Sequence, residues 1–307
     1  MFTVQILGSS SATPAFARYP SSQVLAYNDR YYLIDCGEGT QMQLQKYKIK
    51  ISRMDAIFIS HLHGDHILGL PGFLSSVSIY ERSRPFPLFA PAGMKEIIDL
   101  VFKYSDIELR YELQFHALED YSDGELIFTD GKFQVKSFHL SHRSFCRGFL
   151  FEENNKFSKF DFYKAKELGI PGNLFPQLKE GKSVTLPDGS AVDPEQVLIS
   201  PKPPLSYAYC SDTIFDRGLP DRIRGVNTLY HEATFLDELK IRATQTHHST
   251  AKEAGQIAAM AEAKKLLIGH FSARYGDLDM HLLEARSEFP QTELATEGKT
   301  FAIENDA

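Results

Sequence analysis

The sequence predicts an α/β fold in which strands alternate with helices and end in polar loops. Two observations support this prediction. Short apolar segments with period-two alternation are followed by stretches with helical spacing, a pattern typical of layered α/β proteins. Several of the apolar segments also end directly in a histidine or an aspartate. The residues able to do chemistry are therefore expected in loops at strand ends.

Length and composition fit a globular protein. The 307 residues allow one large α/β domain or two small ones, and 43% hydrophobic residues suffice for a substantial core. The net charge of -7 excludes a generally basic surface. A role with nucleic acid would therefore need a local basic element, or metal ions that supply positive charge at a site.

Cysteine usage and the chain start both favour a cytosolic protein. The three cysteines are widely spaced and include no Cys-x-x-Cys pair, which argues against a disulfide framework and against a thiolate zinc site. The first eight residues lack the basic and apolar regions of a signal peptide. No apolar run reaches the roughly 18–20 residues needed to cross a bilayer. We expect a reduced, cytoplasmic environment and no membrane partner.

The N-terminal elements follow from the apolar segments and the turn residues between them. Gly, Ser, Asn and Asp clusters interrupt the apolar runs and indicate turns. We expect strands over 3–7, 23–27, 31–34 and 56–60, a hairpin turn at 28–30, a helix over 39–46 and another helix from Ile67.

The segment 150–198 differs in character because it is rich in Lys, Pro and Gly. Between Asn154 and Lys182, six lysines stand against three acidic residues, a local excess of +3. It is either a long surface loop or a protruding arm that grips a polyanion. The strand and helix pattern resumes after Leu198, so we expect an insertion within a single domain that spans 1–307.

The strongest chemical signal is the run His61-Leu62-His63-Gly64-Asp65-His66, which directly follows a predicted strand. Imidazole nitrogens and carboxylate oxygens are ligands that zinc prefers. Four of them on so short a loop cannot all reach one tetrahedral ion, whereas two adjacent ions resolve the geometry. Gly64 suits a loop that must turn sharply. The run therefore predicts a dinuclear metal site.

Such a site needs further ligands from distant strand ends. Residues 133–142 alternate so that His142 shares the apolar face while His139 points away, which favours His142 as a ligand and a structural or solvent-facing role for His139. Asp212 and His270 each follow an apolar segment. Asp212 has two carboxylate oxygens, so it could bridge two metals.

Two more stretches favour catalysis, although core packing or a structural salt bridge would also explain them. Glu232 ends an apolar segment, and His248 precedes a predicted helix that Ser249 or Thr250 would cap. A Glu–His pair could hold an imidazolium that donates a proton to a leaving oxygen. Arg274 follows His270 closely, and its guanidinium could bind a phosphate.

With these motifs the sequence resembles the ribonuclease Z family of the metallo-β-lactamase superfamily, over essentially the whole chain. The metal motif alone marks the superfamily. The elements more specific to the family are the arm, His231-Glu232-Ala233-Thr234 and His248-Ser249-Thr250, which accompany Asp35-Cys36-Gly37-Glu38-Gly39 and Phe271-Ser272-Ala273-Arg274-Tyr275.

The resemblance implies a four-layer αβ/βα sandwich with a protruding arm, and a zinc-dependent endonuclease that cuts the 3′ trailer from precursor tRNA. One of two zinc ions per subunit would be held by His61, His63 and His142. The other would be held by Asp65, His66 and His270, with Asp212 bridging. The further roles it implies are Asp65 acting on the attacking water, Glu232 and His248 donating a proton, Arg274 contacting phosphate, and Asp35 bracing the metal loop.

It also implies a homodimer and an arm that grips tRNA. The lysines of that arm are Lys156, Lys159, Lys164, Lys166, Lys179 and Lys182. The main alternative is a hydrolase of the same fold acting on small molecules, such as a phosphodiesterase, thioesterase or lactonase. A di-iron redox protein would usually carry a carboxylate where His63 stands, and a non-catalytic RNA-binding scaffold would be expected to have lost ligands.

Overall fold

The computed structural model describes residues 1–154, 159–199 and 203–305. The chain divides into two compact units, the first formed by Met1–Glu152 with Leu205–Ala307 and the second by Glu153–Pro204. In the described residues, no helix combines the length and apolar character that a membrane crossing requires.

The first sheet of unit 1 has seven strands in the order β18-β1-β2-β3-β4-β5-β6. The strands β1 to β3 are antiparallel neighbours, and β3 to β6 run parallel. Their bounds are β1 Phe2–Gly8, β2 Ser22–Tyr27, β3 Arg30–Cys36, β4 Met54–Phe58, β5 Phe86–Ala90, β6 Leu113–Ala117 and β18 Thr300–Ala302.

The second sheet also has seven strands, in the order β17-β16-β15-β14-β9-β8-β7. The strands β14 to β17 are parallel, whereas β14 pairs antiparallel with β9. Their bounds are β7 Leu126–Thr129, β8 Phe133–His139, β9 Arg147–Glu153, β14 Ser206–Cys210, β15 Thr228–Glu232, β16 Lys265–Gly269 and β17 Thr292–Leu294.

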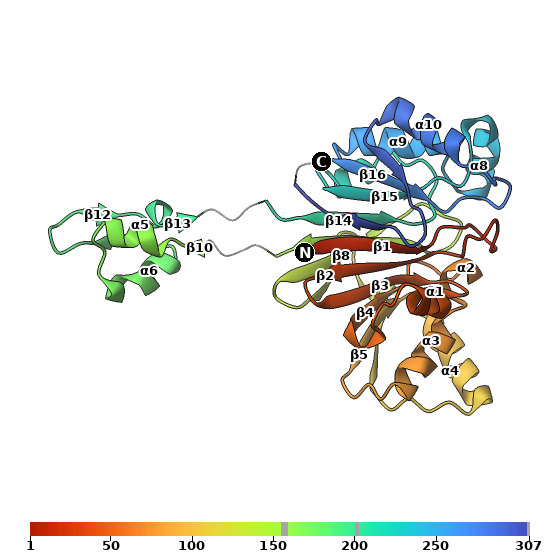
Figure 1. Ribbon diagram of the computed structural model, residues 1–307, viewed down its shortest axis with the longest axis horizontal. Coiled ribbons are helices and arrows are strands. Elements are labelled where there is room, and N and C mark those ends of the chain that lie inside the picture. Colours follow the sequence, from red (N-terminus) through yellow and green to blue (C-terminus); the bar gives the residue numbers. More distant parts are fainter. Residues whose placement is uncertain (155–158, 200–202, 306–307) are drawn as a thin grey trace. The chain divides into compact units, whose positions relative to one another are not determined.

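Helices cover the outer face of each sheet, which gives four layers (Figure 1). Those on the first sheet are α1 Thr40–Lys46, α2 Gly64–Ile67, α3 Leu70–Ile79 and α4 Gly93–Ser105. Those on the second sheet are α7 Leu219–Arg222, α8 Lys240–Thr246, α9 Ala251–Met260 and α10 Asp279–Glu288. Short 3₁₀ turns of unit 1 are η1 Ile51–Arg53, η2 Leu118–Asp120 and η5 Asp237–Leu239.

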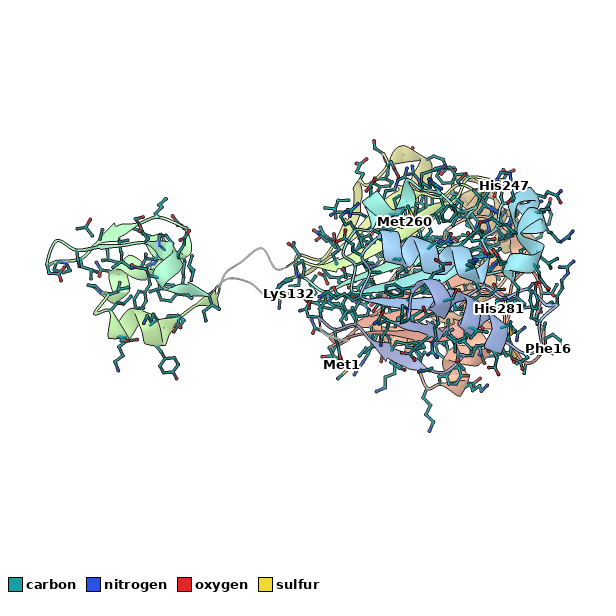
Figure 2. All side chains as sticks on the ribbon, turned by 90° about the horizontal axis from the view of Figure 1, so that it is seen from above. Met1, Phe16, Lys132, His247, Met260 and His281 are labelled. Atoms are coloured by element: carbon teal, nitrogen blue, oxygen red, sulfur yellow. The ribbon has the colours of Figure 1, made fainter. Side chains whose placement is uncertain are left out.

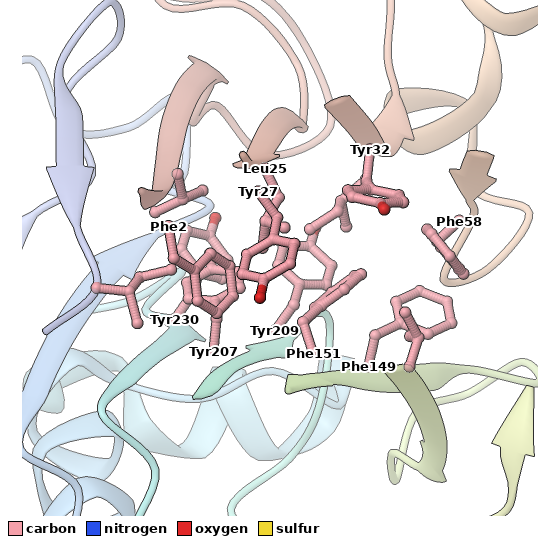
Figure 3. Close-up of a cluster of buried hydrophobic side chains, with 14 of the residues drawn as sticks. Phe2, Leu25, Tyr27, Tyr32, Phe58, Phe149, Phe151, Tyr207, Tyr209 and Tyr230 are labelled. Carbon is pink, nitrogen blue, oxygen red and sulfur yellow. The ribbon is translucent and has the colours of Figure 1, made fainter. Parts of the chain in front are cut away.

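The inner faces of the sheets meet in a core dominated by aromatic rings (Figure 3). Phe58 of the first sheet makes an edge-on contact with Phe151 of the second, at 5.4 Å between ring centroids. Tyr32 stacks on Phe133 at 4.8 Å. Truncation of a buried ring of this kind to Ala costs about 3–5 kcal/mol of stability. These contacts hold the two sheets, and so the loops at their ends, in a fixed relation.

The predicted α/β class is confirmed, and the structure corrects some element bounds. The hairpin of β2 and β3 and the helix α1 form where expected. The strand β4 ends at Phe58, two residues before the predicted end at Ser60. The helix predicted from Ile67 is instead two helices, since α2 already begins at Gly64 and therefore carries Asp65 and His66 itself. Thr250 caps α9 through a capping box with Glu253.

Unit 2 has short elements around a small core of its own. Its core contains Ala165, Ile170, Leu178, Val184, Val192 and Val197. Its elements are β10 Lys159–Phe160, α5 Phe162–Glu167, η3 Gly172–Leu174, α6 Phe175–Lys179, β11 Val184–Thr185, β12 Ala191–Val192, η4 Pro194–Gln196 and β13 Leu198–Ile199. A structureless surface loop is therefore the wrong interpretation of this segment.

Candidate metal centre

The predicted ligands come together at one end of unit 1, where strands of both sheets deliver their loops. Figure 2 shows His247 at this end of the unit and Met1 at the opposite end. The His247 carbonyl accepts a hydrogen bond from the ligand candidate His142. Two glycines let the loops approach closely. A Cβ on Gly37 would lie 2.4 Å from the Asp65 carbonyl oxygen, and one on Gly69 would lie 2.2 Å from the Gly37 carbonyl oxygen.

One group of possible ligands contains His61, His63, His142 and Asp212. The atoms His63 Nδ1 and His142 Nε2 are 3.4 Å apart, and His61 Nε2 lies 3.5 Å from Asp212 Oδ2. In a tetrahedral zinc site with bonds of about 2.0–2.1 Å, neighbouring ligand atoms lie about 3.3–3.4 Å apart. The spacing therefore suits one tetrahedral ion.

A second group contains Asp65, His66 and His270. Here His270 Nε2 is 3.3 Å from Asp65 Oδ2 and 3.4 Å from His66 Nε2. The other oxygen of Asp212, Oδ1, lies 3.4 Å from His66 Nε2 and 3.2 Å from His270 Nε2. Asp212 thus presents one oxygen to each group, the arrangement expected of a carboxylate between two metals.

The ring nitrogens that point away from the centre are held by other protein groups. His142 Nδ1 donates to the His247 carbonyl at 2.8 Å, and His66 Nδ1 donates to Asp35 Oδ2 at 2.7 Å. His270 Nδ1 lies 2.9 Å from Thr234 Oγ1. Such contacts fix the tautomer that leaves the inward nitrogen free for a metal.

Two inward atoms are buried without a hydrogen-bond partner, namely His61 Nε2 and Asp212 Oδ1. Burying a polar atom without a hydrogen-bond partner costs free energy, so such an atom in a well-packed site indicates that a ligand normally contacts it. Divalent cations would satisfy both atoms at once. The residues therefore fit metal binding, and imidazoles with carboxylates are a donor set that zinc accepts.

Asp35 is the second-last residue of β3, is fully buried and contacts the histidine motif. Its Oδ1 accepts from the Ser60 backbone at 2.7 Å, and its Oδ2 accepts from His66 Nδ1 and from the Tyr209 hydroxyl, both at 2.7 Å. Its backbone adopts a left-handed conformation with φ of 52°. Asp35 thus joins the metal loop to both sheets.

Glu232 and His248 form an ion pair beside the centre. His248 Nδ1 donates to Glu232 Oε1 at 2.8 Å and lies 3.9 Å from Asp212 Oδ2. Burial lowers the pKa of His248, but the Glu232 and Asp212 carboxylates outweigh it and raise the pKa to about 9. These carboxylates favour the protonated form of His248, which a proton donor needs.

The remaining predicted residues are not members of the ligand groups. Arg274 is exposed, with Nη1 3.4 Å from Ser272 Oγ, and does not line the cavity at the centre. His139 is exposed at the end of β8, whereas His142 lies beyond the strand in the following loop. The lysines of the predicted arm that have described side chains are all exposed, namely Lys164, Lys166, Lys179 and Lys182. Lys156 and the side chain of Lys159 lie outside the described residues.

The structure adds residues that sequence reasoning missed. A cavity of about 320 Å³ beside the ligands is lined also by Arg143, Ser11 and Ala12. The Ala12 amide donates to Asp65 Oδ2 at 2.6 Å. Thr234 donates to Glu232 Oε2 at 2.5 Å and so connects Glu232 to His270. The sequence did offer a signal for two of them. Arg143 directly follows His142, and Thr234 lies two residues after Glu232.

Comparisons with known proteins place the chain among its relatives. A ribonuclease Z of Porphyromonas gingivalis is 42% identical over 296 residues, with 96% of this chain and 97% of that protein covered. A ribonuclease Z of Cytophaga hutchinsonii is 44% identical, with 98% and 96% covered. The chain belongs to the ribonuclease Z family. A family model described as Anti-Pycsar protein Apyc1 matches residues 2–158, so the first half of the chain falls in that family as well.

Solved structures agree with this assignment. The short form of human tRNase Z superposes with a TM-score of 0.70 at 26% identity, with 98% of this chain and 99% of that chain covered. The metallo-β-lactamase fold protein YhfI from Bacillus subtilis superposes with a TM-score of 0.69 at 19% identity, over 98% of this chain and all of that chain. The fold of this ribonuclease Z family member is therefore the metallo-β-lactamase fold.

Proposed function

We propose that the protein is a zinc-dependent endoribonuclease that removes the 3′ trailer from precursor tRNA. The products are a tRNA with a 3′-hydroxyl and a trailer with a 5′-phosphate. The observation that carries the proposal is the shared position of Asp212. It presents one oxygen to each ligand group while lying 3.9 Å from His248 Nδ1. The ribonuclease Z relatives over nearly the full chain support the substrate.

Two bound zinc ions would lower the pKa of an attacking water and stabilise the charge on the phosphorane. The carboxylate of Asp65 orients that water, and the Ala12 amide holds the carboxylate in place. His248 gives its proton to the leaving 3′ oxygen of the tRNA. Glu232 keeps His248 charged before transfer and fixes its ring. Arg274 contacts a phosphate of the bound RNA.

Unit 2 is proposed as the inserted arm that binds tRNA. Its exposed Lys179 lies over the rings of Phe160 and Phe162, at 5.3 and 4.9 Å from their centroids. Exposed cations beside aromatic rings suit a phosphate backbone with accessible bases. Lys164 and Lys182 are ion-paired with glutamates at the surface, pairs that water screens and an RNA phosphate can displace.

We propose a cytoplasmic homodimer. The family resemblance supports this assembly. Ile79 at the end of α3 and Tyr80 directly after it are 71% and 70% exposed, and Tyr80 lines a surface cavity together with the exposed Met42. A partner subunit could cover these apolar side chains. Light scattering on the intact protein and on Tyr80→Asp tests it, and a wild-type monomer at micromolar concentration contradicts it.

The function is tested with a precursor tRNA that carries a 3′ trailer, cut by the wild type and by His66→Ala. We expect cleavage at one position by the wild type and none by the variant. Hydrolysis of a small phosphodiester without cleavage of the RNA would refute the tRNA assignment.

The arm is tested by deleting unit 2. Glu152 and Ser206 are partners in the antiparallel pairing of β9 and β14, so a two-residue Asn-Gly turn can join the strands after deletion of the unit. We expect weaker precursor tRNA binding with a shallower salt dependence, while the metals and small-diester hydrolysis are retained. Unchanged affinity and salt slope would rule out the arm as an RNA-binding element.

A further inference from the structure

Arg143 lies in the loop between β8 and β9, directly after the candidate ligand His142. Its side chain is exposed and lines the same cavity of about 320 Å³ as His63, Asp65 and His248. Among the described residues it makes no hydrogen bond or ion pair. An arginine beside a reactive centre is thus left without a structural partner.

The two residues directly before Arg143 are held by hydrogen bonds to other segments. Immediately before it, the His142 ring donates to the His247 carbonyl at 2.8 Å. The Ser141 amide donates to Thr213 Oγ1 at 3.2 Å, and its carbonyl accepts from the Ile214 amide at 3.0 Å. The side chain of Arg143 therefore lines the cavity from a segment that hydrogen bonds anchor on its N-terminal side. Such placement reduces the entropy lost when a ligand binds.

The other charged groups of the cavity already have partners or a proposed role. Asp65 and Asp212 belong to the ligand groups, and His248 is paired with Glu232. Arg274 lies outside the residues that line the cavity. Among the described residues that line the cavity, Arg143 is therefore the cation that an entering anion would find free. A guanidinium fork matches two oxygens of one phosphate.

We propose that Arg143 binds the backbone phosphate of a nucleotide that flanks the scissile phosphate. This rests on the proposed RNA substrate. The scissile phosphate itself faces the ligand groups, so the nearest additional anion of a bound RNA is an adjacent phosphodiester. Small diesters have no such phosphate. Arg143 therefore favours polynucleotides over small phosphodiesters at the same centre.

The first test compares Arg143→Ala, Arg143→Lys and Arg110→Ala. Arg110 is an exposed arginine away from the cavity and serves as a control for the loss of one positive charge. We expect kcat/KM for precursor tRNA to fall about 10- to 100-fold in Arg143→Ala, because the substitution removes a pair of charge-assisted hydrogen bonds. Bis(p-nitrophenyl) phosphate hydrolysis falls much less, Arg143→Lys recovers part of the loss, and Arg110→Ala matches the wild type.

The second test identifies the phosphate. Precursor tRNAs carry one methylphosphonate, with the adjacent 2′-hydroxyl methylated, on the 5′ or the 3′ side of the cleavage site. The matched control is the 2′-O-methyl phosphodiester. At one of the two positions we expect the neutral linkage to slow the wild type but not Arg143→Ala. If the neutral linkage slows the wild type and Arg143→Ala by the same factor at both positions, the two changes act independently and the proposal is wrong.

Three other outcomes are decisive. If Arg143→Ala cleaves precursor tRNA as well as Arg110→Ala does, the proposal is wrong while the RNA function stands. If Arg143→Ala loses bound metal and both activities in parallel, the role is structural and the proposal is again wrong. If the wild type fails to cleave precursor tRNA, the proposed function itself fails.

Discussion

Replacing Asp35 with Asn removes one negative charge at a site where every neighbour is a donor. Oδ1 accepts from the Ser60 amide, and Oδ2 accepts from the Ser60 hydroxyl, His66 Nδ1 and the Tyr209 hydroxyl. Asn has only one oxygen, so its NH₂ group faces a donor in either orientation. The left-handed backbone at this position, with φ of 52°, suits Asn. The perturbation is therefore confined to the side chain.

Two effects follow, and their sizes can be worked from these contacts. Loss of a hydrogen bond to a charged group costs about 1.5–3 kcal/mol, and a buried donor left without an acceptor costs about 1–3 kcal/mol. The metal-free protein should lose about 3–5 kcal/mol of unfolding free energy. His66 also loses the carboxylate that fixes its tautomer, which typically lowers metal affinity about 10- to 100-fold.

Zinc affinity is measured by competition with a chromophoric chelator, and stability by urea unfolding of the chelator-treated protein. Tyr209→Phe is the control, because it removes one donor without placing an NH₂ group against the others. We expect it to cost about 1 kcal/mol and to change zinc affinity little. Equal effects of the two substitutions, or unchanged zinc affinity in Asp35→Asn, would refute the role of the charge.

Three further predictions concern the centre. In Glu232→Gln, His248 loses a nearby negative charge that helps to hold its pKa near 9. His248 should then deprotonate at lower pH, so the alkaline limb of the kcat profile should move down by about one to two pH units. An alkaline limb that does not move would argue against His248 as the proton donor. Thr234→Val removes the hydroxyl between Glu232 and His270; titration should show one of two bound zinc ions weakened about 10-fold or more, and two unchanged sites contradict it. Chelation should lower Tm reversibly, because bound metals stabilise the folded state by mass action; a Tm indifferent to added zinc would count against a metal site.

Much of the centre could be predicted from the sequence because its signals are local. Strand β16 and the residue that follows it are contiguous, so an apolar run that ends at His270 indicates a histidine at a strand end. The same reasoning located Asp212 after β14 and the motif after β4. The capping of α9 by Thr250 is also local, and was predicted as one of two alternatives.

Other features depend on contacts between residues far apart in the chain. The approach of His270 to Asp65 joins residues 205 positions apart, and Tyr209 reaches Asp35 across 174 positions. No local pattern states which nitrogen of each imidazole points inward or that the two oxygens of Asp212 divide between two groups. Packing of the two sheets through their aromatic core decides both, because it sets the strand ends against each other.

The sequence by itself determined the α/β class and the histidines and carboxylates at the strand ends, since apolar periodicity and short-range spacing encode them. The tertiary structure decided which side chains share the cavity. It placed Arg143 in the lining of one cavity with Asp65 and left Arg274 outside that lining, although both arginines closely follow a candidate histidine in the sequence. It also gave 153–204 a core of its own. The physical reason is that cavity geometry and burial arise from the packing of distant segments, which neighbouring residues alone do not specify.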